Sequence, residues 1–387
     1  MQGKRMNIDD IKSIAVIGAG DMGHGIAEVA LMAGYKVFLR DIKQEFVDKG
    51  VARINQSLEK LVSKGKVEQS LFDKIQSELL VPCVELEDAV KEADLVIEAV
   101  PEIMELKQET FSAMDKIAPA HTIFASNTST MKITEIAAIT KRPEKVVGLH
   151  YFNPAVLMKL VEVIRGDKTT DEVMQIGVDF VLKNAKVPVR VEKDVAGFIV
   201  NRCQAPAGVL LNAILDEGKI QPEQIDAVMR SIGAPMGPYE TMDYTGLDIS
   251  YHGSLYFAKT IHPDFACGKV IQGKIEANEL GKKTGKGLFD WSQGRPEIDL
   301  SKATDQFDLM DLVAVNVNEA TKIIGEGACK LEDIDLAIVN ATGGMGPMAL
   351  VAGMEPADLT KRLEGLAERW GKEIFKPTQM IKDGQYR

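Results

Sequence analysis

The feature that most constrains the fold of this chain is a strand, a glycine turn and a helix near its start. SIAVI (13–17) is an apolar run, GAGDMG (18–23) follows it, and a helical pattern then continues to about Ala33. KVFLRD (36–41) is a second apolar run. This order predicts one βαβ unit with parallel strands. A chain that begins in this way is expected to continue as a doubly wound α/β sheet.

The glycines of this turn suit a dinucleotide. Gly18 permits the tight turn, Gly20 lets the backbone approach a pyrophosphate, and Gly23 lets the helix pack closely on the strand. The pyrophosphate would lie at the N-terminus of the helix. Asp41 ends the second strand, where a carboxylate accepts hydrogen bonds from the adenosine ribose and repels a 2′-phosphate. The pattern therefore predicts a cofactor site in which NAD is favoured over NADP.

The sheet is expected to resume after a helical insertion. Two polar helical patterns, at residues 45–66 and 69–79, are not needed to continue the sheet and predict an inserted hairpin. Further strands are expected at residues 93–100, 122–127, 146–149 and 160–164. Ligands of such folds lie at the carboxyl ends of the strands, and Glu102, Ser126–Ser129 and His150–Asn153 all follow strand ends.

A histidine and a glutamate in this region are candidates for proton transfer. In KLVEVI the period of a strand places Leu160, Glu162 and Ile164 on one face, so Glu162 lies among residues that favour burial. A buried carboxylate needs a partner. The preceding strand, VVGL, ends at His150, and pairing of the two strands would present the imidazole and the carboxylate at two parallel strand ends. We therefore expect a buried His150–Glu162 pair.

The chain becomes helical from Val195 onward, which predicts a second domain. A polar, turn-rich segment, SQGRPEIDLSKA, follows Trp291 and is expected to be a linker. Beyond it the chain repeats itself, because residues 211–238 placed over 320–347 without gaps share nine identities. The repeat indicates a duplicated helical domain. The domains are expected at residues 10–193, 194–292 and 304–387.

Composition narrows the class of protein. With 387 residues, of which 45% are hydrophobic, the chain can bury more than one core. A net charge of −11, without a basic stretch rich in aromatic residues, argues against nucleic acid as a partner. The first ten residues lack the apolar core of a signal peptide, and no run is long enough to span a membrane, so a cytoplasmic location is expected. The four cysteines form no CxxC pair and the five histidines show no ligand spacing, so no metal site is expected.

Eight motifs carry a likeness to a known family. They are GAGDMGHGIA, LRDIKQEFVDKG, IEAVPE, SNTST, GLHYFNPAVLMKLVEVIRG, GFIVNR, PMGPYETMDYTGLD and GKKTGKG. In this order they resemble the L-3-hydroxyacyl-CoA dehydrogenases, above all the short-chain 3-hydroxybutyryl-CoA dehydrogenases, over about residues 12–292. The third segment, residues 304–387, resembles the second C-terminal domain of multifunctional fatty-acid oxidation proteins. Tyr151 departs from the family, which usually has phenylalanine there, and Ala196 stands where a proline often precedes GF.

The resemblance implies a fold and a reaction. The fold is a Rossmann-type doubly wound sheet with an inserted helical hairpin, followed by two all-α domains like the C-terminal domain of 6-phosphogluconate dehydrogenase. The reaction is the reversible NAD-dependent oxidation of an L-3-hydroxyacyl-CoA, expected to be short-chain, to a 3-ketoacyl-CoA, as in fatty-acid β-oxidation. His150 would be the general base for the hydroxyl proton, and Glu162 would orient the imidazole and stabilise its charged form.

The resemblance also implies the remaining site residues. Ser129 and Asn201 would hold the substrate oxygens against the base. Ser57 and Lys64 lie two helical turns apart on the inserted hairpin and match the family's contacts with the nucleotide end of coenzyme A. The implied cofactor contacts are Gly18, Ala19, Gly20, Asp21, Met22, Gly23, Asp41, Glu102, Lys107, Ser129, Asn153 and Lys283.

Two other functions and two assembly states stay open from the sequence. A β-hydroxyacid dehydrogenase that acts on free acids has a similar two-part architecture, but it typically uses a lysine as its catalytic group. A dinucleotide-binding structural protein without catalytic activity is the other alternative. The repeated domain could occupy the place of a partner subunit, giving a monomer with an internal pseudo-dimer rather than a homodimer. Met310 is the residue that the repeat aligns with Asn201, so the second copy is expected to be structural.

Overall fold

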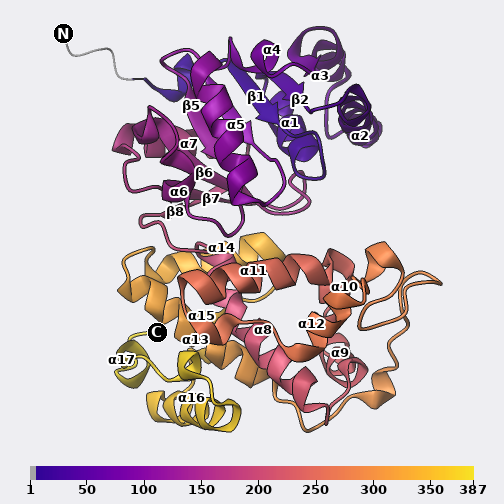
Figure 1. The fold of residues 1–387 in the computed structure, drawn as a ribbon, viewed down its shortest axis with the longest axis vertical. Coiled ribbons are helices and arrows are strands. Elements are labelled where there is room, and N and C mark those ends of the chain that lie inside the picture. The colour runs from indigo at the N-terminus through magenta and orange to yellow at the C-terminus, as the bar shows by residue number, and fades with distance from the viewer. Residues whose placement is uncertain (1–5) are drawn as a thin grey trace. The chain divides into compact units, whose positions relative to one another are not determined.

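The computed structural model describes residues 6–387 (Figure 1). The chain separates into two compact units: residues 6–200 with 326–346, and residues 201–325 with 347–387. This division differs from the expected one, because the third expected domain, residues 304–387, is split between the two units. Residues 326–346 come from the expected third domain, yet their helix, α14 (Leu331–Thr342), packs on the last two strands of the first unit. No helix of residues 6–387 is long and apolar enough to cross a membrane.

The first unit is built on one sheet of eight strands in the order β3-β2-β1-β4-β5-β6-β7-β8. The strands are β1 (Ser13–Ile17), β2 (Lys36–Arg40), β3 (Leu80–Cys83), β4 (Leu95–Glu98), β5 (Ile123–Ser126), β6 (Val146–Tyr151), β7 (Leu160–Arg165) and β8 (Val187–Val191). All neighbours are parallel except β6 and β7. The doubly wound α/β fold expected from the glycine turn is confirmed.

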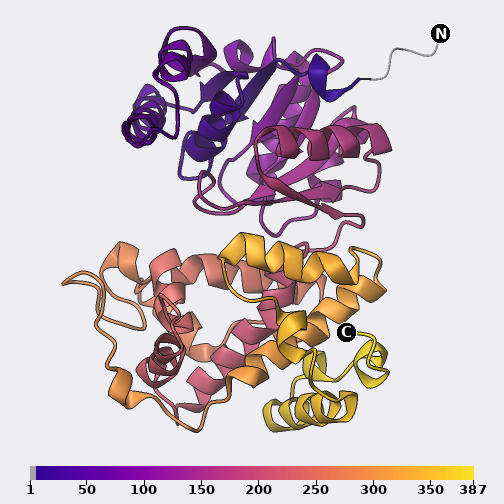
Figure 2. The same cartoon turned by 180° about the vertical axis from the view of Figure 1, so that it is seen from behind.

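Helices cover both faces of this sheet, and the strands are accordingly apolar on both sides. The helices are α1 (Gly23–Met32), α2 (Gln44–Ser63), α3 (Gln69–Lys74), α4 (Leu86–Val90), α5 (Met104–Ile117), α6 (Ile133–Ala137) and α7 (Asp171–Lys183). α5 lies on one face of the sheet, and α1 and α7 lie on the other (Figures 1 and 2). Side chains of α1 and α7 form one buried core with the strands. The expected inserted hairpin is α2 and α3, which a π-helical turn (Ile75–Leu79) extends.

Two strands, β3 and β8, were not expected from the sequence. Each contains a proline, Pro82 or Pro188, and a proline weakens the prediction of a strand because it cannot donate to a neighbour. The structure places these strands at the two ends of the sheet, where one side of each has no neighbouring strand. The prolines therefore mark edge strands rather than loops.

The expected parallel alignment of the strands of His150 and Glu162 is wrong. β6 and β7 are antiparallel, with His150 directly opposite Glu162 in the register. Only residues 152–159 connect the two strands, whereas a crossover between parallel strands takes about a dozen residues or more. The two side chains still meet, but as cross-strand neighbours.

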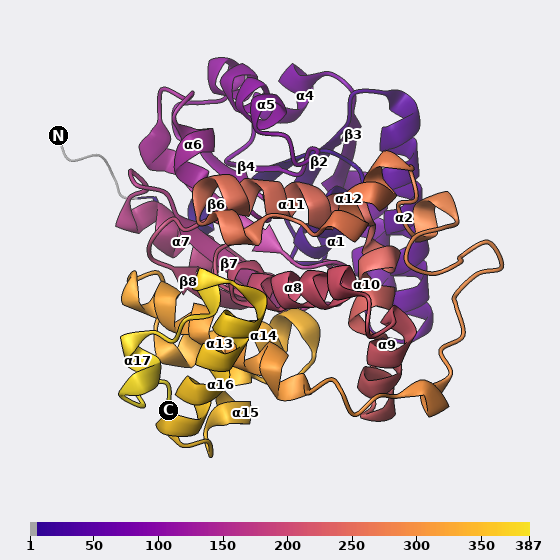
Figure 3. The ribbon, with the colours of Figure 1, turned by 60° about the horizontal axis from the view of Figure 1, so that its bottom comes forward.

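The second unit is mainly helical, with isolated β-bridges between residues 281 and 290. Its helices are α8 (Val200–Glu217), α9 (Pro222–Ser231), α10 (Pro238–Thr245), α11 (Leu247–Thr260), α12 (Lys269–Glu276), α13 (Leu309–Gly325), α15 (Pro347–Val351), α16 (Pro356–Trp370) and α17 (Gln379–Lys382). The last three gather around α13 (Figure 3). The expected linker after Trp291 has one short 3-10 turn (Leu300–Lys302), which packs on α9.

Tyr151 carries a buried hydroxyl that has no hydrogen-bond partner among the described residues. Burial and the neighbouring Tyr35 raise the pKa of this phenol. Because an unsatisfied buried polar group costs stability, we expect Tyr151→Phe to raise the free energy of unfolding by about 1 kcal/mol in urea denaturation. Tyr239→Phe is the control: Tyr239 donates to the Leu211 carbonyl at 2.7 Å, so its loss should destabilise by about 1 kcal/mol. Destabilisation by Tyr151→Phe would contradict this account.

Candidate active site

The core of the site is a buried histidine–carboxylate pair on β6 and β7. His150 Nδ1 lies 2.6 Å from Glu162 Oε2, and the two residues are 5% and 0% exposed. Glu162 Oε1 accepts hydrogen bonds from the backbone N–H groups of Ile199 and Val200, each at 3.0 Å. An ionised carboxylate only accepts, so the proton on Nδ1 faces Glu162. The other ring nitrogen, Nε2, is then the basic atom of the pair.

A turn before α8 aims these two N–H groups at Glu162. Gly197 and Phe198 both adopt positive φ, at +76° and +56°. A bulky residue rarely adopts this conformation, and Phe198 is held in it by complete burial. Its ring lies 5.8 Å from the His150 ring, and the Phe152 ring lies at 4.4 Å. The sequence reasoning missed this turn as part of the site, although the GF pair of GFIVNR is its signal.

The glycine turn after β1 has the geometry of a dinucleotide cradle. Gly18 has a φ of +107°, and a Cβ at Gly23 would lie 1.7 Å from the Gly18 carbonyl oxygen. A Cβ at Gly20 would meet no atom within 4 Å, so the backbone there is open to a ligand. Asp41 Oδ2 accepts from the Ala19 N–H at 2.8 Å, which ties the end of β2 to the turn. The residues that are present therefore fit a pyrophosphate and an adenosine ribose.

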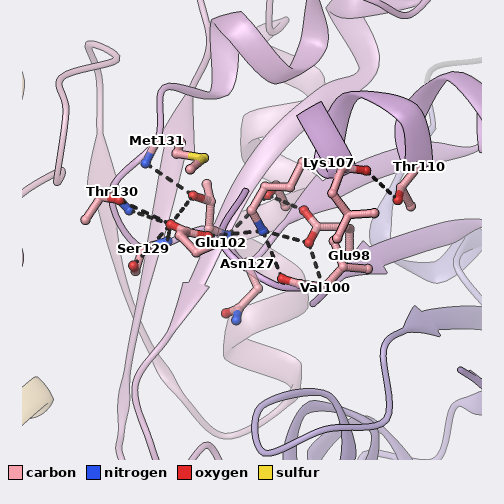
Figure 4. Close-up of polar contacts among 12 residues, drawn as sticks. Glu98, Val100, Glu102, Lys107, Thr110, Asn127, Ser129, Thr130 and Met131 are labelled. Carbon is pink, nitrogen blue, oxygen red and sulfur yellow. Dashed lines mark hydrogen bonds and ion pairs between the residues drawn. The ribbon is translucent and has the colours of Figure 1, made fainter. Parts of the chain in front are cut away.

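A chain of three charges, of which Glu98 and Lys107 are buried and Glu102 is partly exposed, lies at the ends of β4 and β5 (Figure 4). Lys107 is 1% exposed, and its Nζ lies 2.8 Å from Glu98 Oε1 and 3.1 Å from Glu102 Oε2. Burial lowers the pKa of Lys107, but the two carboxylates outweigh it, so the net shift is upward. Burial likewise raises the pKa of Glu102, yet Lys107 and nearby donors lower it overall. Glu102 Oε1 accepts from the backbone of Ser129 at 2.8 Å.

The loop that carries Ser129 is also tied to the strand of the histidine. Asn127 Oδ1 accepts from the Tyr151 N–H at 2.8 Å, one residue beyond His150. The Thr130 carbonyl accepts from the Gly197 N–H at 3.0 Å, in the turn that serves Glu162. The loop of Ser129 is thus hydrogen-bonded both to the strand of His150 and to the turn that serves Glu162. Glu98 was not predicted from the sequence, although it ends a strand. Asn127 lies within the range 126–129 that was expected to follow a strand end, but no role was assigned to it.

Comparison with known proteins identifies the family. Residues 13–195 match the 3-hydroxyacyl-CoA dehydrogenase NAD binding domain, and residues 197–291 match the 3-hydroxyacyl-CoA dehydrogenase C-terminal domain. A probable 3-hydroxybutyryl-CoA dehydrogenase of Bacillus subtilis is 39% identical over 292 residues, which are 73% of this chain and 99% of that protein. The chain belongs to the 3-hydroxyacyl-CoA dehydrogenase family.

Two further members are similar over nearly the whole chain. The crystal structure of 3-hydroxybutyryl-CoA dehydrogenase from Escherichia coli has a TM-score of 0.87 at 29% identity and covers 97% of this chain and 98% of that chain. The peroxisomal fatty acid beta-oxidation multifunctional protein MFP2 of Arabidopsis thaliana is 30% identical over 400 residues, which are 96% of this chain and 54% of that protein. The third segment, residues 304–387, therefore also lies within the part of the chain that these two relatives match.

The structure also describes the surroundings of the other cofactor and substrate contacts that the 3-hydroxyacyl-CoA dehydrogenase family implies. Asn153 is exposed in the segment after β6. Asp21 is exposed in the glycine turn and pairs with Arg53 at 2.6 Å. Asn201 and Lys283 belong to the second unit, in which Lys283 pairs with Asp248. Met22 precedes the first turn of α1.

The implied coenzyme A contacts on α2 differ in their surroundings. Ser57 Oγ donates to Glu28 Oε1 on α1 at 2.6 Å, so its hydroxyl is turned towards a buried carboxylate. Burial raises the pKa of Glu28 to about 7. Lys64 caps the C-terminus of α2 and is exposed. Lys64 is thus exposed, whereas Ser57 is half-buried.

Proposed function

We propose that the chain catalyses the reversible oxidation of L-3-hydroxyacyl-CoA to 3-ketoacyl-CoA with NAD, preferring short acyl chains such as 3-hydroxybutyryl. The buried pair of His150 and Glu162 is the observation that carries this proposal. Family membership supports the substrate class, and the two relatives named as 3-hydroxybutyryl-CoA dehydrogenases support the short chain.

His150 acts as the general base in this proposal. Its Nε2 accepts the proton of the C3 hydroxyl as hydride leaves C3, and it returns the proton in the reverse direction. Glu162 holds the Nδ1–H tautomer and stabilises the imidazolium that forms. Burial of the pair between Phe152 and Phe198 strengthens this interaction because little water screens it. NAD, when bound on the glycine turn, supplies the hydride acceptor.

The turnover of acetoacetyl-CoA tests the proposal directly. We expect the chain to oxidise NADH in its presence, with kcat/KM falling along a ladder of longer 3-ketoacyl-CoA substrates. Free acetoacetate is the control, because turnover of the free acid without turnover of the thioester would favour the β-hydroxyacid dehydrogenases. Binding of NADH, seen by its fluorescence, without turnover of any 3-ketoacyl-CoA would favour a structural dinucleotide-binding protein.

Asp41 is proposed to set the preference for NAD. The variant Asp41→Asn keeps a carbonyl oxygen for the Ala19 N–H but loses the charge that would repel a 2′-phosphate. We expect the ratio of kcat/KM for NADH over NADPH to fall about tenfold, a typical result of removing one like-charge contact. Asp73→Asn, at an exposed position on α3, is the control. An unchanged ratio in Asp41→Asn would contradict the role of the carboxylate.

We infer that the third segment is a second copy of the helical domain with a structural role. The order of α8 to α12 repeats in α13 to α17. A Cβ at Gly237 would lie 2.2 Å from the Asp226 carboxyl carbon, and a Cβ at Gly346 would lie 2.2 Å from that of Asp335. The repeat aligns Asn201 with Met310, which cannot hold a substrate oxygen. A monomer in light scattering is expected if this copy replaces a partner subunit, and a dimer would contradict that replacement.

A further inference from the structure

We propose that Glu98 is a positioning residue that acts through Lys107 and Glu102 on the loop carrying Ser129. The inference rests on the proposed function, because that function gives Ser129 its role towards the substrate oxygen. Glu98 ends β4 and is 0% exposed, so neither substrate nor cofactor reaches it. Its effect on the reaction must therefore pass through the groups that it holds.

Glu98 is the buried anchor of the charge chain. Its Oε1 accepts from the Val100 N–H at 2.7 Å and from Lys107 Nζ at 2.8 Å. Its Oε2 accepts from Ser126 Oγ at 2.7 Å. A buried ammonium needs a paired and hydrogen-bonded charge, and Glu98 supplies one for Lys107. A neutral glutamine at this position would keep the shape of the side chain but not the charge.

All three N–H donors of the Lys107 ammonium group have acceptors inside the protein. An ammonium group has three donors. Three oxygens surround Nζ: Glu98 Oε1 at 2.8 Å, Glu102 Oε2 at 3.1 Å and the Val100 carbonyl at 3.3 Å. The family resemblance implied that Lys107 contacts the cofactor, but this arrangement favours an indirect role. Because Lys107 pairs with both carboxylates, the position of Glu102 depends on that of Glu98.

Glu102 organises the loop from Asn127 to Met131 (Figure 4). Its Oε1 accepts from Thr128 Oγ1 at 2.6 Å and from the backbone N–H groups of Ser129 and Thr130 at 2.8 and 3.1 Å. The hydroxyls of Ser129 and Thr130 each lie at 3.2 Å from the same oxygen. Five donors compete for one carboxylate oxygen, so the longer hydroxyl contacts are exchangeable. The Ser129 hydroxyl can turn to a substrate oxygen while its backbone N–H stays fixed.

A second arm from Glu98 holds the start of the same loop. Ser126 Oγ, which donates to Glu98, accepts from the Thr128 N–H at 3.2 Å. The loop is thereby fixed at both Thr128 and Ser129 by groups that converge on Glu98. Because Asn127 ties this loop to the strand of His150, Glu98 sets where Ser129 stands relative to the base. A displacement of about 1 Å in such an arrangement can cost about 100-fold in rate.

The test compares Glu98→Gln with Ser129→Ala and with the double variant. We expect Glu98→Gln to lower kcat for acetoacetyl-CoA by about 10- to 100-fold, with the KM for NADH changed by less than about threefold. Amide hydrogen exchange in residues 127–131 should become faster. If Glu98 acts through Ser129, the double variant should be no slower than Ser129→Ala alone.

Asp115→Asn is a control for the loss of an ion pair, in this case a half-buried one on the same helix. Asp115 lies on α5, the helix of Lys107, and pairs with Arg142 at 2.6 Å away from the loop. We expect this variant to lose stability but to keep kcat. Ser126→Ala removes only the second arm and leaves the charges intact, so it serves if Glu98→Gln fails to fold; it should also slow the reaction and accelerate exchange at Thr128.

Three results would overturn the positioning role. The first is a kcat for Glu98→Gln within twofold of wild type, and the second is an independent, multiplicative loss in the double variant. The third is unchanged amide exchange in residues 127–131 of the folded variant. The third measurement needs no turnover, so it still tests the positioning role if the wild-type chain turns over no 3-ketoacyl-CoA and the proposed function fails.

Discussion

His150→Gln should lower kcat for the reduction of acetoacetyl-CoA by about 10²- to 10⁴-fold, the range that a general acid–base group contributes. Glutamine keeps a hydrogen-bonding group towards Glu162 Oε2 but has no basic nitrogen in place of Nε2. The hydroxyl proton then has no acceptor on this residue. Because the glycine turn is unchanged, the Kd for NADH, measured by fluorescence titration, should stay within about threefold of wild type.

His121→Gln is the matched control for this variant. His121 is exposed and pairs with Asp94 at 2.9 Å, at the amino ends of the strands and therefore at the opposite edge of the sheet. The variant His121→Gln should keep the wild-type kcat for acetoacetyl-CoA. A rate in His150→Gln within a few-fold of wild type, with the fold intact, would remove His150 from the role of base and leave the buried pair with a structural role alone.

Sequence periodicity was sufficient to predict the buried pair of His150 and Glu162, but not the groups that hold it. The strand pattern of KLVEVI identified Glu162 as buried, and the register of β6 and β7 confirmed its meeting with His150. The direction of pairing was wrong because the period of a strand carries no information about direction. The length of the connection carries that information. The backbone donors to Glu162 were missed because they depend on the positive φ of Gly197 and Phe198.

The charge chain shows a second limit of sequence reasoning. Glu98 and Ser126 are 28 positions apart, and only the parallel pairing of β4 with β5 places them side by side. The strand pattern placed Glu102 after a strand end, Lys107 was identified through the resemblance alone, and the resemblance implied that both contact the cofactor. The distances from Lys107 Nζ show instead that this buried lysine pairs with two carboxylates, those of Glu98 and Glu102. Such networks follow from tertiary structure, so local patterns do not predict them.

The largest effect on stability is expected from Glu319→Ala in the second unit. Glu319 Oε1 lies 2.5 Å from Arg202 Nε, and the two side chains are 1% and 6% exposed. Glu319 Oε2 accepts from Lys322 Nζ at 2.7 Å. Removing one partner of a buried ion pair typically costs about 3–5 kcal/mol, because the remaining charge stays desolvated. We expect a loss of that size in the free energy of unfolding, measured by urea denaturation.

Glu373→Ala removes the acidic partner of an exposed pair with Lys376 and should cost less than about 1 kcal/mol, which makes it the control. The double variant Arg202→Met with Glu319→Leu removes both charges, and it should recover much of the loss because apolar residues of similar volume replace a buried pair well. Equal losses in Glu319→Ala and Glu373→Ala would show that the Arg202 pair contributes no more than a surface contact.

The pair of Arg202 and Glu319 links α13 to the helix that carries Asn201. Arg202 follows Asn201 on α8, and Glu319 lies on α13. The proposed function requires Asn201 to hold the substrate oxygen. The Bacillus relative has no counterpart of this segment, since 99% of its length matches 73% of this chain. Glu319→Ala should therefore lower kcat as well as stability, and the double variant should recover stability more fully than kcat.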